Sequence, residues 1–332
     1  DMEPALLLPM GFGAILINIP FSGAEGVMSS LFAIGIEMNE IMPLVLFIGI
    51  GAMIDFGPLL SNPKLFLFGG AAQFGIFLTI LLAAACGFSI EDAASIGIIG
   101  AADGPTSIVV AQTLKSNYVG PIMVVAYSYM ALVPIIQPAV IKLTTTKKER
   151  LIRMEYKPAS VSKRTKILFP ILVTIVSGLI APASLSLVGM LMFGNLIREC
   201  GVLNYLTDTA KDVLTNLVTL FLGITIAFTM KAENFITVQT LMIMGLGLCA
   251  FIFDTFSGVM LAKVMNLFLK EKINPMIGAA GISAFPMSAR IVQKMGIKED
   301  PTNHLLMHAV GANVSGQIAS AIVGGLIIGL VL

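Results

Sequence analysis

The chain has 332 residues and a formal net charge of +1, with 57% hydrophobic and only 12% charged residues. Soluble domains carry about 25% charged residues, and the mean hydropathy here is +0.94. This composition excludes a domain that faces water all round and predicts an all-α polytopic membrane protein. The near-zero charge predicts no nucleic-acid partner. The three cysteines are scattered, so no disulfide framework or metal cluster is expected.

The first part of the chain is divided by proline, glycine and acidic residues. Its apolar stretches are residues 6–21, 26–39, 43–56 and 65–88. Pro9 and Pro20 predict that the first stretch is short, broken or partly re-entrant, and Glu37 favours an interfacial position for the second. The third stretch ends in a break at residues 55–58. The fourth is long enough to cross a bilayer, which takes about 20 apolar residues.

Residues 97–112, GIIGAADGPTSIVVAQ, place a carboxylate inside strongly apolar sequence. Gly104 is conformationally permissive and Pro105 disfavours the α conformation of the residue before it, so a helix running in from Ile96 should break near Asp103. Non-helical backbone at membrane depth is tolerated only where protein buries it or it lines a wet cavity. An ionisable residue at such a break indicates a functional site. The structural alternative is that Asp103 only caps the second half-helix.

The later part of the chain continues the alternation of apolar stretches and interruptions. The stretches are residues 118–143, 167–197, 214–229, 240–253, 256–269, 273–295 and 303–332. Pro182 divides the second of these into a span and a shorter hairpin arm, and residues 198–212 are polar. Asp254 falls between two stretches, so we expect it to lie beside a helix end. We expect the same position for Asp55. Both are structural or second-tier candidates.

A basic loop interrupts the apolar pattern near the middle of the chain. Residues 142–166 hold nine of the 20 lysines and arginines against two glutamates. By the positive-inside rule this loop lies in the cytoplasm. Nothing in the sequence supports a further lipid- or partner-binding role for it.

The second half of the chain echoes the first. GIIGAADGPTSIVVAQ at position 97 aligns without a gap with GAAGISAFPMSARIVQ at position 278, which matches Gly100 with Gly281 and Pro105 with Pro286. Paired broken segments at corresponding positions indicate a transporter-type binding site. We therefore expect two inverted repeats with broken or re-entrant helices in an elevator-transporter-like fold, rather than a chance match of glycine-rich helices. The predicted divisions are N-terminal membrane or interfacial segments (1–42), the first repeat (43–143), the basic loop with connecting spans (144–213) and the second repeat (214–332).

Polar side chains gather in the breaks and final helices of both halves. They are Asp103, Thr106, Ser107, Tyr129, Asn274, Ser283, Ser288, Arg290, Asn313, Ser315 and Gln317. Carboxylate, hydroxyl and amide oxygens suit a hard cation such as Na⁺ rather than a softer metal. The guanidinium of Arg290 fits a carboxylate. The alternative without a functional role is that Arg290 lies at a helix end and snorkels to the membrane interface. Tyr129 either relays a proton or belongs to an interfacial belt. His304 and His308 lack the glutamate of a zincin motif, so no metal other than Na⁺ is expected.

Four motifs in one order resemble a known family. They are GAMIDFGPLL at Gly51, GAADGPTS at Gly100, INPMIGAAGISAFPMSARIVQK at Ile273 and NHLLMHAVGANVSGQIASA at Asn303. Together they resemble the β subunit of sodium-pumping biotin-dependent decarboxylases, which serve oxaloacetate, methylmalonyl-CoA and glutaconyl-CoA. The resemblance covers nearly the whole chain.

The resemblance implies a function that spacing alone does not give. In the family, a carboxyltransferase α subunit moves a carboxyl group from the substrate to biotin on a carrier subunit or domain. The β subunit then decarboxylates carboxybiotin, exports Na⁺ and consumes a proton. It follows that this chain has no tightly bound cofactor of its own, works with a small γ or δ subunit in an oligomer, and lies in a prokaryotic inner membrane as a multi-pass protein.

Motif matching to the family also implies roles for particular residues. The catalytic set is Asp103, Tyr129 and Arg290, the Na⁺-binding set is Asp103, Asn274, Ser283 and Asn313, and the second-tier set is Thr106, Ser107 and Ser288. The main rival is a secondary Na⁺/carboxylate transporter without chemistry, which also predicts a Na⁺ site and an anion-attracting arginine. A third interpretation, a subunit that only anchors partners, leaves costly intramembrane polar groups without a role.

Overall fold

The computed structural model describes residues 2–20, 23–38, 40–156 and 161–332, and the regular structure in these residues is entirely helical. Five helices there are long and apolar enough to cross a membrane: Pro63–Ala85, Val119–Thr144, Asn204–Ala227, Val238–Phe268 and Leu306–Val331. A sixth span arises if the bent pair Ala24–Glu37 and Ile41–Met53 counts as one. This agrees with the polytopic membrane protein predicted from composition.

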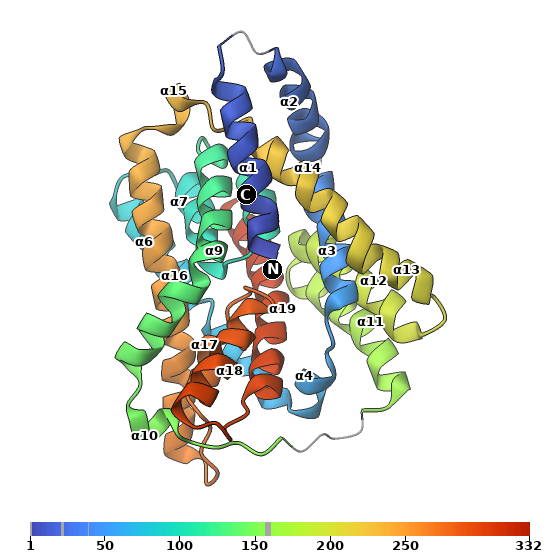
Figure 1. Cartoon of the computed structure of the whole chain (residues 1–332), viewed down its shortest axis with the longest axis vertical. Coiled ribbons are helices and arrows are strands. Elements are labelled where there is room, and N and C mark those ends of the chain that lie inside the picture. Colours follow the sequence, from blue (N-terminus) through green and yellow to red (C-terminus); the bar gives the residue numbers. More distant parts are fainter. Residues whose placement is uncertain (1, 21–22, 39, 157–160) are drawn as a thin grey trace.

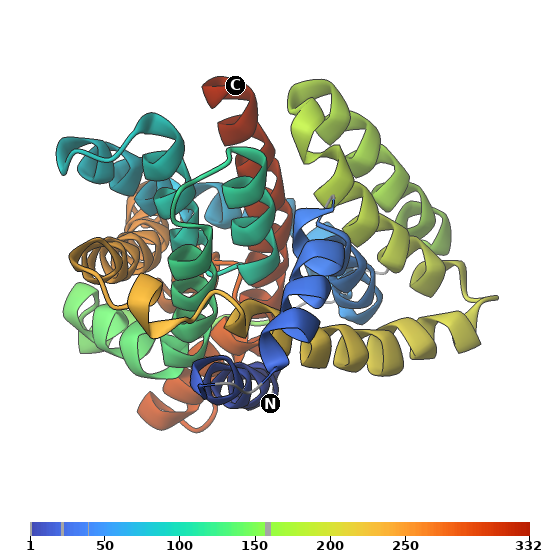
Figure 2. The same ribbon diagram turned by 90° about the horizontal axis from the view of Figure 1, so that it is seen from above.

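The helices form two groups that lie side by side (Figure 1, Figure 2). One, here called the α3 group, consists of α1 (Met2–Asn18), α2 (Ala24–Phe32), α3 (Ile41–Met53), α11 (Lys163–Ile180), α12 (Leu185–Cys200), α13 (Asn204–Asp208) and α14 (Thr215–Ala227). The other, the α19 group, consists of α4 (Gly57–Ser61), α5 (Phe66–Ala71), α6 (Phe74–Ala85), α7 (Ile90–Gly97), α8 (Gly104–Thr113), α9 (Val119–Thr144), α10 (Lys147–Arg150), α16 (Val238–Phe268), α17 (Met276–Ala279), α18 (Met287–Glu299) and α19 (Leu306–Val331). The short helix α15 (Ala232–Phe235) connects the groups.

Small residues let the helices of the α3 group approach closely. A Cβ on Gly51 of α3 would lie 1.9 Å from the carbonyl oxygen of Leu191 in α12, so no larger residue fits at this crossing. The C-terminus of α3 is capped from α12, because Asn195 Nδ2 donates to the Ile54 carbonyl at 2.9 Å and Arg198 donates to the same oxygen. The predicted break after the third apolar stretch is confirmed here, since α3 ends at Met53 and α4 begins at Gly57.

The two glycine- and proline-rich segments are broken helices, as predicted. In the first, α7 is followed by a 3₁₀ turn, Ile98–Ala101 (η3), and α8 begins after Asp103. In the second, α17 and α18 are separated by residues 280–286. Residues 167–197 also divide as predicted, at the 3₁₀ turn Pro182–Ser184.

One expectation about helix boundaries is wrong. The stretches 240–253 and 256–269 belong to the single helix α16 (Val238–Phe268) rather than to two helices, because the side chain of Asp254 finds a donor on a neighbouring helix and no break is needed. Of the alternatives for the first apolar stretch, the structure shows the short one, because the apolar helix Leu6–Asn18 falls below the length of a span. This helix runs unbroken through Pro9, whose ring packs near Gly223 of α14. Phe21, at the end of that predicted stretch, lies outside the described residues. The polar stretch 198–212 ends in helical structure that continues into α14, and the side chains of Asp208 and Asp212 are exposed there beside Lys211.

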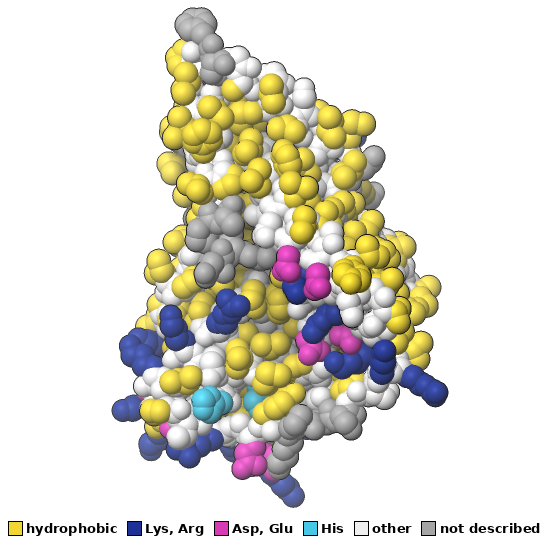
Figure 3. Space-filling model, turned by 45° about the vertical axis from the view of Figure 1, so that its right-hand side comes forward, with side chains coloured by type: hydrophobic (Ala, Val, Ile, Leu, Met, Phe, Trp, Pro, Cys, Tyr) yellow, Lys and Arg dark blue, Asp and Glu magenta, His cyan; other side chains and the backbone are white. Residues whose placement is uncertain are grey.

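The charged side chains are concentrated toward one end of the molecule. Figure 3 shows hydrophobic side chains over the upper body and lysines and arginines spread across the lower part. The basic loop, α10 and the C-terminal end of α18 lie at this lower end (Figure 1). An apolar surface above a charged end is the pattern of a protein embedded in a bilayer.

Candidate cation site at two helix breaks

The two breaks face each other inside the α19 group. In the first, Ala102 adopts the left-handed conformation with φ of 53° between η3 and α8. In the second, residues 280–286 run without helical structure between α17 and α18. The N–H of Ser283 donates to the carbonyl of Ala101 at 3.1 Å. The two broken segments, far apart in the sequence, are therefore in direct contact.

Side chains of α19 hold the second break in place. Asn313 Nδ2 donates to the Ile282 carbonyl at 2.6 Å, and the Gln317 amide donates to the Ser283 carbonyl. The Ser283 hydroxyl donates in return to Gly316 O at 2.9 Å. Backbone groups freed by a break need partners where water is scarce, so these contacts explain how a non-helical segment persists at this depth.

Asp103 stands at the junction of the breaks. It is the N-cap residue of α8 and is only 3% exposed. Its Oδ2 accepts hydrogen bonds from Thr106 Oγ1 at 2.7 Å and from Ser320 Oγ at 2.9 Å. Because Ser320 belongs to α19, a role limited to capping α8 does not account for the arrangement.

A cavity between the two helix groups opens onto this carboxylate. The α3 group contributes Thr215 and Thr219 to its walls, and the α19 group contributes Asp103, Tyr127, Ser283 and Gln317. The cavity leaves about 80 Å³ for the centres of water molecules, and one water needs roughly 10–15 Å³ on this measure. There is room for several waters or for a small hydrated ion.

Two oxygens in the cavity wall lack hydrogen-bond partners in the described part of the chain. They are the hydroxyl of Tyr127 and Oε1 of Gln317, and both are buried. A buried polar atom without a partner costs about 1–3 kcal/mol, so such atoms mark a place for a ligand or an ordered water. With Asp103, they supply carboxylate, phenol and amide oxygens, which is a donor set for a hard cation.

Several residues predicted from the sequence meet at this site. Asp103 and Ser283 line the cavity, and Thr106 binds the carboxylate of Asp103. Ser107 supports the break, because its hydroxyl donates to the Asp103 carbonyl at 2.9 Å. Asn313 is fully buried behind the second break, and its Oδ1 has no hydrogen-bond partner within the described ranges.

Other predicted residues do not line the cavity. The hydroxyl of Tyr129 donates to the Met244 carbonyl on α16. Ser288 accepts a hydrogen bond from Gln137 Nε2 at 2.6 Å and so links α18 to α9. Arg290 is exposed on α18, and its guanidinium forms no ion pair with the residues that the structure describes.

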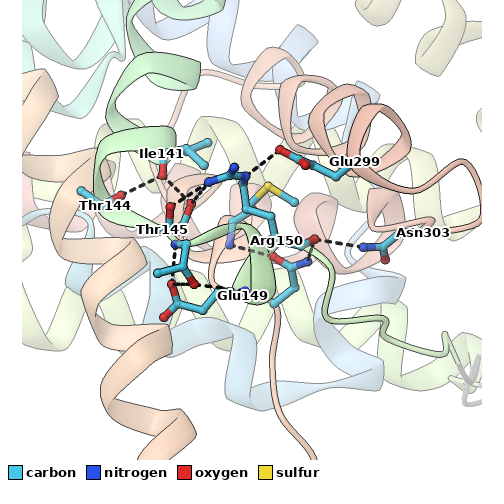
Figure 4. A network of polar contacts seen from close by, with 10 residues as sticks. Ile141, Thr144, Thr145, Glu149, Arg150, Glu299 and Asn303 are labelled. Carbon is cyan, nitrogen blue, oxygen red and sulfur yellow. Dashed lines mark hydrogen bonds and ion pairs between the residues drawn. The ribbon is translucent and has the colours of Figure 1, made fainter.

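Asn274 belongs to a separate network with Arg150 and Asn303 at the charged end of the molecule, and Figure 4 shows the latter two residues. Its side-chain amide donates to the carbonyls of Arg150 at 2.9 Å and Ile152 at 2.8 Å. Asn303 donates to the same two carbonyls at 3.3 and 3.2 Å. Residues 145–156, here called the strap, are therefore clamped from both ends of the α17–α18 segment. Asn274 does not line the cavity.

Two ion pairs add to the clamp on the strap. Arg150 Nε lies 2.7 Å from Glu299 Oε1, as Figure 4 shows, and Arg153 lies 2.7 Å from Asp300. The N–H and hydroxyl of Thr302 hold the pKa of Asp300 below its ordinary value, with Arg153 helping. The acid therefore stays charged at neutral pH, and the strap is fixed to the C-terminal end of α18.

The sequence interpretation named Gln317 among the polar candidates without a specific role, and it assigned no site role to Tyr127 or Ser320. A signal existed for Gln317 and Ser320, because Asn313, Gln317 and Ser320 follow at intervals of about one helical turn on α19 and so share one face. Tyr127 and Tyr129 were both visible in the sequence, but helix rotation decides which of them reaches the cavity.

The fold and site define a helical membrane protein with a buried carboxylate where two broken segments meet. The chain belongs to the family of Na⁺-transporting oxaloacetate decarboxylase beta subunits, whose match covers residues 1–331. It is therefore a decarboxylase subunit of a Na⁺-pumping complex, as the sequence motifs predicted.

Named relatives agree with this assignment. The chain is 51% identical to the methylmalonyl-CoA decarboxylase subunit beta of Propionigenium modestum, over 99% of this chain and 90% of that protein. It is 49% identical to the glutaconyl-CoA decarboxylase subunit beta of Acidaminococcus fermentans, over 99% and 88%. It is also 43% identical to the oxaloacetate decarboxylase beta chain of Klebsiella pneumoniae, over 99% and 90%.

Proposed function

We propose that this chain decarboxylates carboxybiotin delivered by a biotin carrier and couples the reaction to Na⁺ export, with Asp103 as the Na⁺-binding carboxylate. The observation that carries the proposal is the position of Asp103, buried at the contact of two helix breaks and facing a cavity. A carboxylate in such a place within a membrane protein binds an ion or a proton. The partnerless oxygens of Tyr127 and Gln317 support Na⁺ as the ion.

The chemistry requires a proton as well as a cation. Decarboxylation of carboxybiotin breaks the bond between the ring nitrogen and the carboxyl carbon, releases CO₂ and leaves a nitrogen that takes up one proton. Asp103 and Tyr127 are the titratable groups on the cavity wall. Competition of Na⁺ and H⁺ for the Asp103 carboxylate then links the proton that the reaction consumes to the Na⁺ that leaves.

The division into two helix groups supports an elevator-like movement of two inverted repeats. Each proposed repeat, 43–143 and 214–332, gives one arm to the α3 group, namely α3 and α14, and its remaining helices to the α19 group. Segments 1–42 and 144–213 supply the other helices of the α3 group and the basic loop. Because the cavity lies between the groups, sliding one against the other opens Asp103 to each side of the membrane in turn.

The charged end of the molecule is the proposed cytoplasmic end. The positive-inside rule places loop 142–166 in the cytoplasm of a prokaryotic inner membrane. The biotin carrier, the carboxyltransferase α subunit and a small γ or δ subunit are the proposed partners in an oligomeric complex. Arg290, exposed on α18, is suited to attract the carboxylate of carboxybiotin as the carrier approaches.

Free carboxybiotin and the purified chain in liposomes provide the test. The proposal predicts CO₂ release that requires Na⁺ and moves Na⁺ across the membrane. Na⁺ movement driven by a carboxylate gradient, with no CO₂ release, would instead establish the rival transporter without chemistry. The acyl substrates named for the relatives belong to those proteins, and free carboxybiotin avoids any assumption about them.

A further inference from the structure

α16 carries a carboxyl group that the proposed function does not use. Asp254 lies in the interior of this 31-residue helix and is fully buried. Its Oδ1 accepts the N–H of Gly75, in the first turn of α6, at 2.5 Å. Its Oδ2 has no hydrogen-bond partner among the residues that the structure describes. One oxygen of this acid is thus satisfied and the other is not.

The partnerless oxygen faces the first broken segment. A Cβ on Gly100 would lie 2.5 Å from Asp254 Oδ2 and 2.8 Å from the Cβ of Ala250. Only glycine leaves room for the carboxyl group at this point of η3. The turn leads within three residues to Asp103, so Asp254 packs directly against the segment that carries the proposed Na⁺ site.

No charged partner reaches this carboxyl group within the described residues. The elements packed against this part of α16 are α5, α6, η3, α7, α9 and α17, of which α5, α6, η3 and α17 carry no titratable side chain. On α7, Glu91 and Asp92 lie in the first turn, at the opposite end from η3. On α9, the hydroxyl of Tyr129 is engaged with Met244. Among the three cysteines, Cys249 on α16 is the one nearest to Asp254 in the sequence.

We propose that Asp254 is a second proton-binding site, neutral in the conformation described here and ionised at another stage of the transport cycle. An ionised carboxylate here would leave a charged oxygen without a donor inside a membrane helix, and the N-terminus of α6 offsets only part of that penalty. A proton on Oδ2 removes the charge. A cation needs several oxygen ligands, whereas the groups around this carboxyl group are the backbone N–H groups of Gly75 and Ile76 and the surfaces of Gly100 and Ala250.

The consequence is a link between protonation and the position of the broken segment. When Asp254 loses its proton, the new charge lies against Gly100 and favours any arrangement that brings water or a donor to Oδ2. A shift of η3 carries Asp103 with it. Asp254 thereby senses the proton while Asp103 binds Na⁺.

Asp254→Asn separates this role from simple capping of α6. The amide oxygen still accepts the N–H of Gly75 and the side chain stays neutral, but it cannot release a proton. We expect an unchanged melting temperature and a loss of Na⁺-dependent decarboxylation of roughly a hundredfold, which is the scale for removing a proton-transfer group. Wild-type turnover in this variant would overturn the proposal. The matched control is Thr255→Val, the next buried residue of α16, which should retain turnover; an equal loss there would also count against a specific role for Asp254.

Infrared spectroscopy tests the neutral state without using activity. A protonated carboxylic acid has a C=O stretch that is well separated from the bands of ionised carboxylates. We expect such a band in the purified wild-type chain and in Asp103→Asn, and its disappearance when Asp254→Asn is added to the Asp103→Asn background. Labelling the aspartates with ¹³C in the Asp103→Asn background should shift the band, even if Asp254→Asn does not fold. The proposal would be overturned if no C=O band of a protonated aspartate is observed at neutral pH.

Discussion

The N–H of Ser283 donates to the carbonyl of Ala101 at 3.1 Å, which joins the two broken segments of the chain directly. Asp103 follows Ala101 by two residues, and Gln317 donates to the carbonyl of Ser283. The proposed Na⁺ site is therefore built by both halves of the chain together. A change in either break alters the position of the Asp103 carboxylate.

The two nearby tyrosines of α9 should behave differently. Tyr127→Phe removes the partnerless hydroxyl from the cavity wall, so we expect the Na⁺ concentration for half-maximal decarboxylation to rise about tenfold, equivalent to about 1.4 kcal/mol. Tyr129→Phe loses only the bond to the Met244 carbonyl and should lower turnover without shifting Na⁺ affinity. The reverse pattern would indicate that Tyr129, the tyrosine that the family resemblance implies, acts at the Na⁺ site instead of Tyr127.

Arg290 should affect the anionic reactant rather than Na⁺. Arg290→Lys keeps the charge but loses the planar fork that matches a carboxylate, so we expect normal Na⁺ binding and a turnover lower by about tenfold. Lys294→Ala, one turn further along α18 and also exposed, is the control and should behave as wild type. Weaker Na⁺ binding with full turnover at high Na⁺ would place Arg290 at the cation site instead.

The clamp on the strap predicts unequal effects of its two asparagines. Asn274→Ala should lower the free energy of unfolding by about 1–3 kcal/mol. In this variant the carbonyls of Arg150 and Ile152 keep only the longer hydrogen bonds from Asn303. Asn303→Ala should cost less. The double variant should cost more than the sum, since both carbonyls then lack donors. Thermal unfolding in detergent measures all three, and strict additivity would contradict the shared clamp.

The crossing of α16 and α17 depends on a glycine that tolerates no side chain. A Cβ on Gly278 would lie 1.9 Å from the carbonyl oxygen of Gly258, and backbone cannot easily move aside. Gly278→Ala should therefore destabilise the fold by about 3 kcal/mol or more, at the upper end for overpacking. Gly245 lies in α16, and no atom lies within 4 Å of a Cβ added there. Gly245→Ala should therefore leave the stability of the fold unchanged or raise it by up to about 1 kcal/mol. Equal melting temperatures for the two variants would contradict the close crossing.

Local chemistry explains what the sequence could predict. Gly104 is conformationally permissive and Pro105 disfavours the α conformation of the residue before it, so this Gly-Pro pair predicted the break at Asp103, whereas a lone proline such as Pro9 lies inside an unbroken helix. The matched glycine and proline of the second segment predicted its break in the same way. The charge of residues 142–166 and the apolar spans were equally local properties.

Features that depend on helix rotation and tertiary partners were not predictable. Residues two positions apart on a helix point about 200° apart, and sequence gives no rotation for α9, so Tyr127 and Tyr129 could not be ranked. Asp254 resembled a helix end until Gly75 of α6 was found to be its partner. The contacts of Asn274 with the strap likewise join segments far apart in the chain.

The central claim is that the Asp103 carboxylate binds the transported Na⁺ and is required for decarboxylation. The most direct measurement follows Na⁺ transport and CO₂ release together in liposomes containing Asp103→Asn, with free carboxybiotin as the reactant. Asp92→Asn, a buried aspartate that binds Ser116 and Asn117 instead, is the matched control and should retain coupling. We predict that Asp103→Asn abolishes both activities. CO₂ release at the wild-type rate without Na⁺ transport would contradict the account.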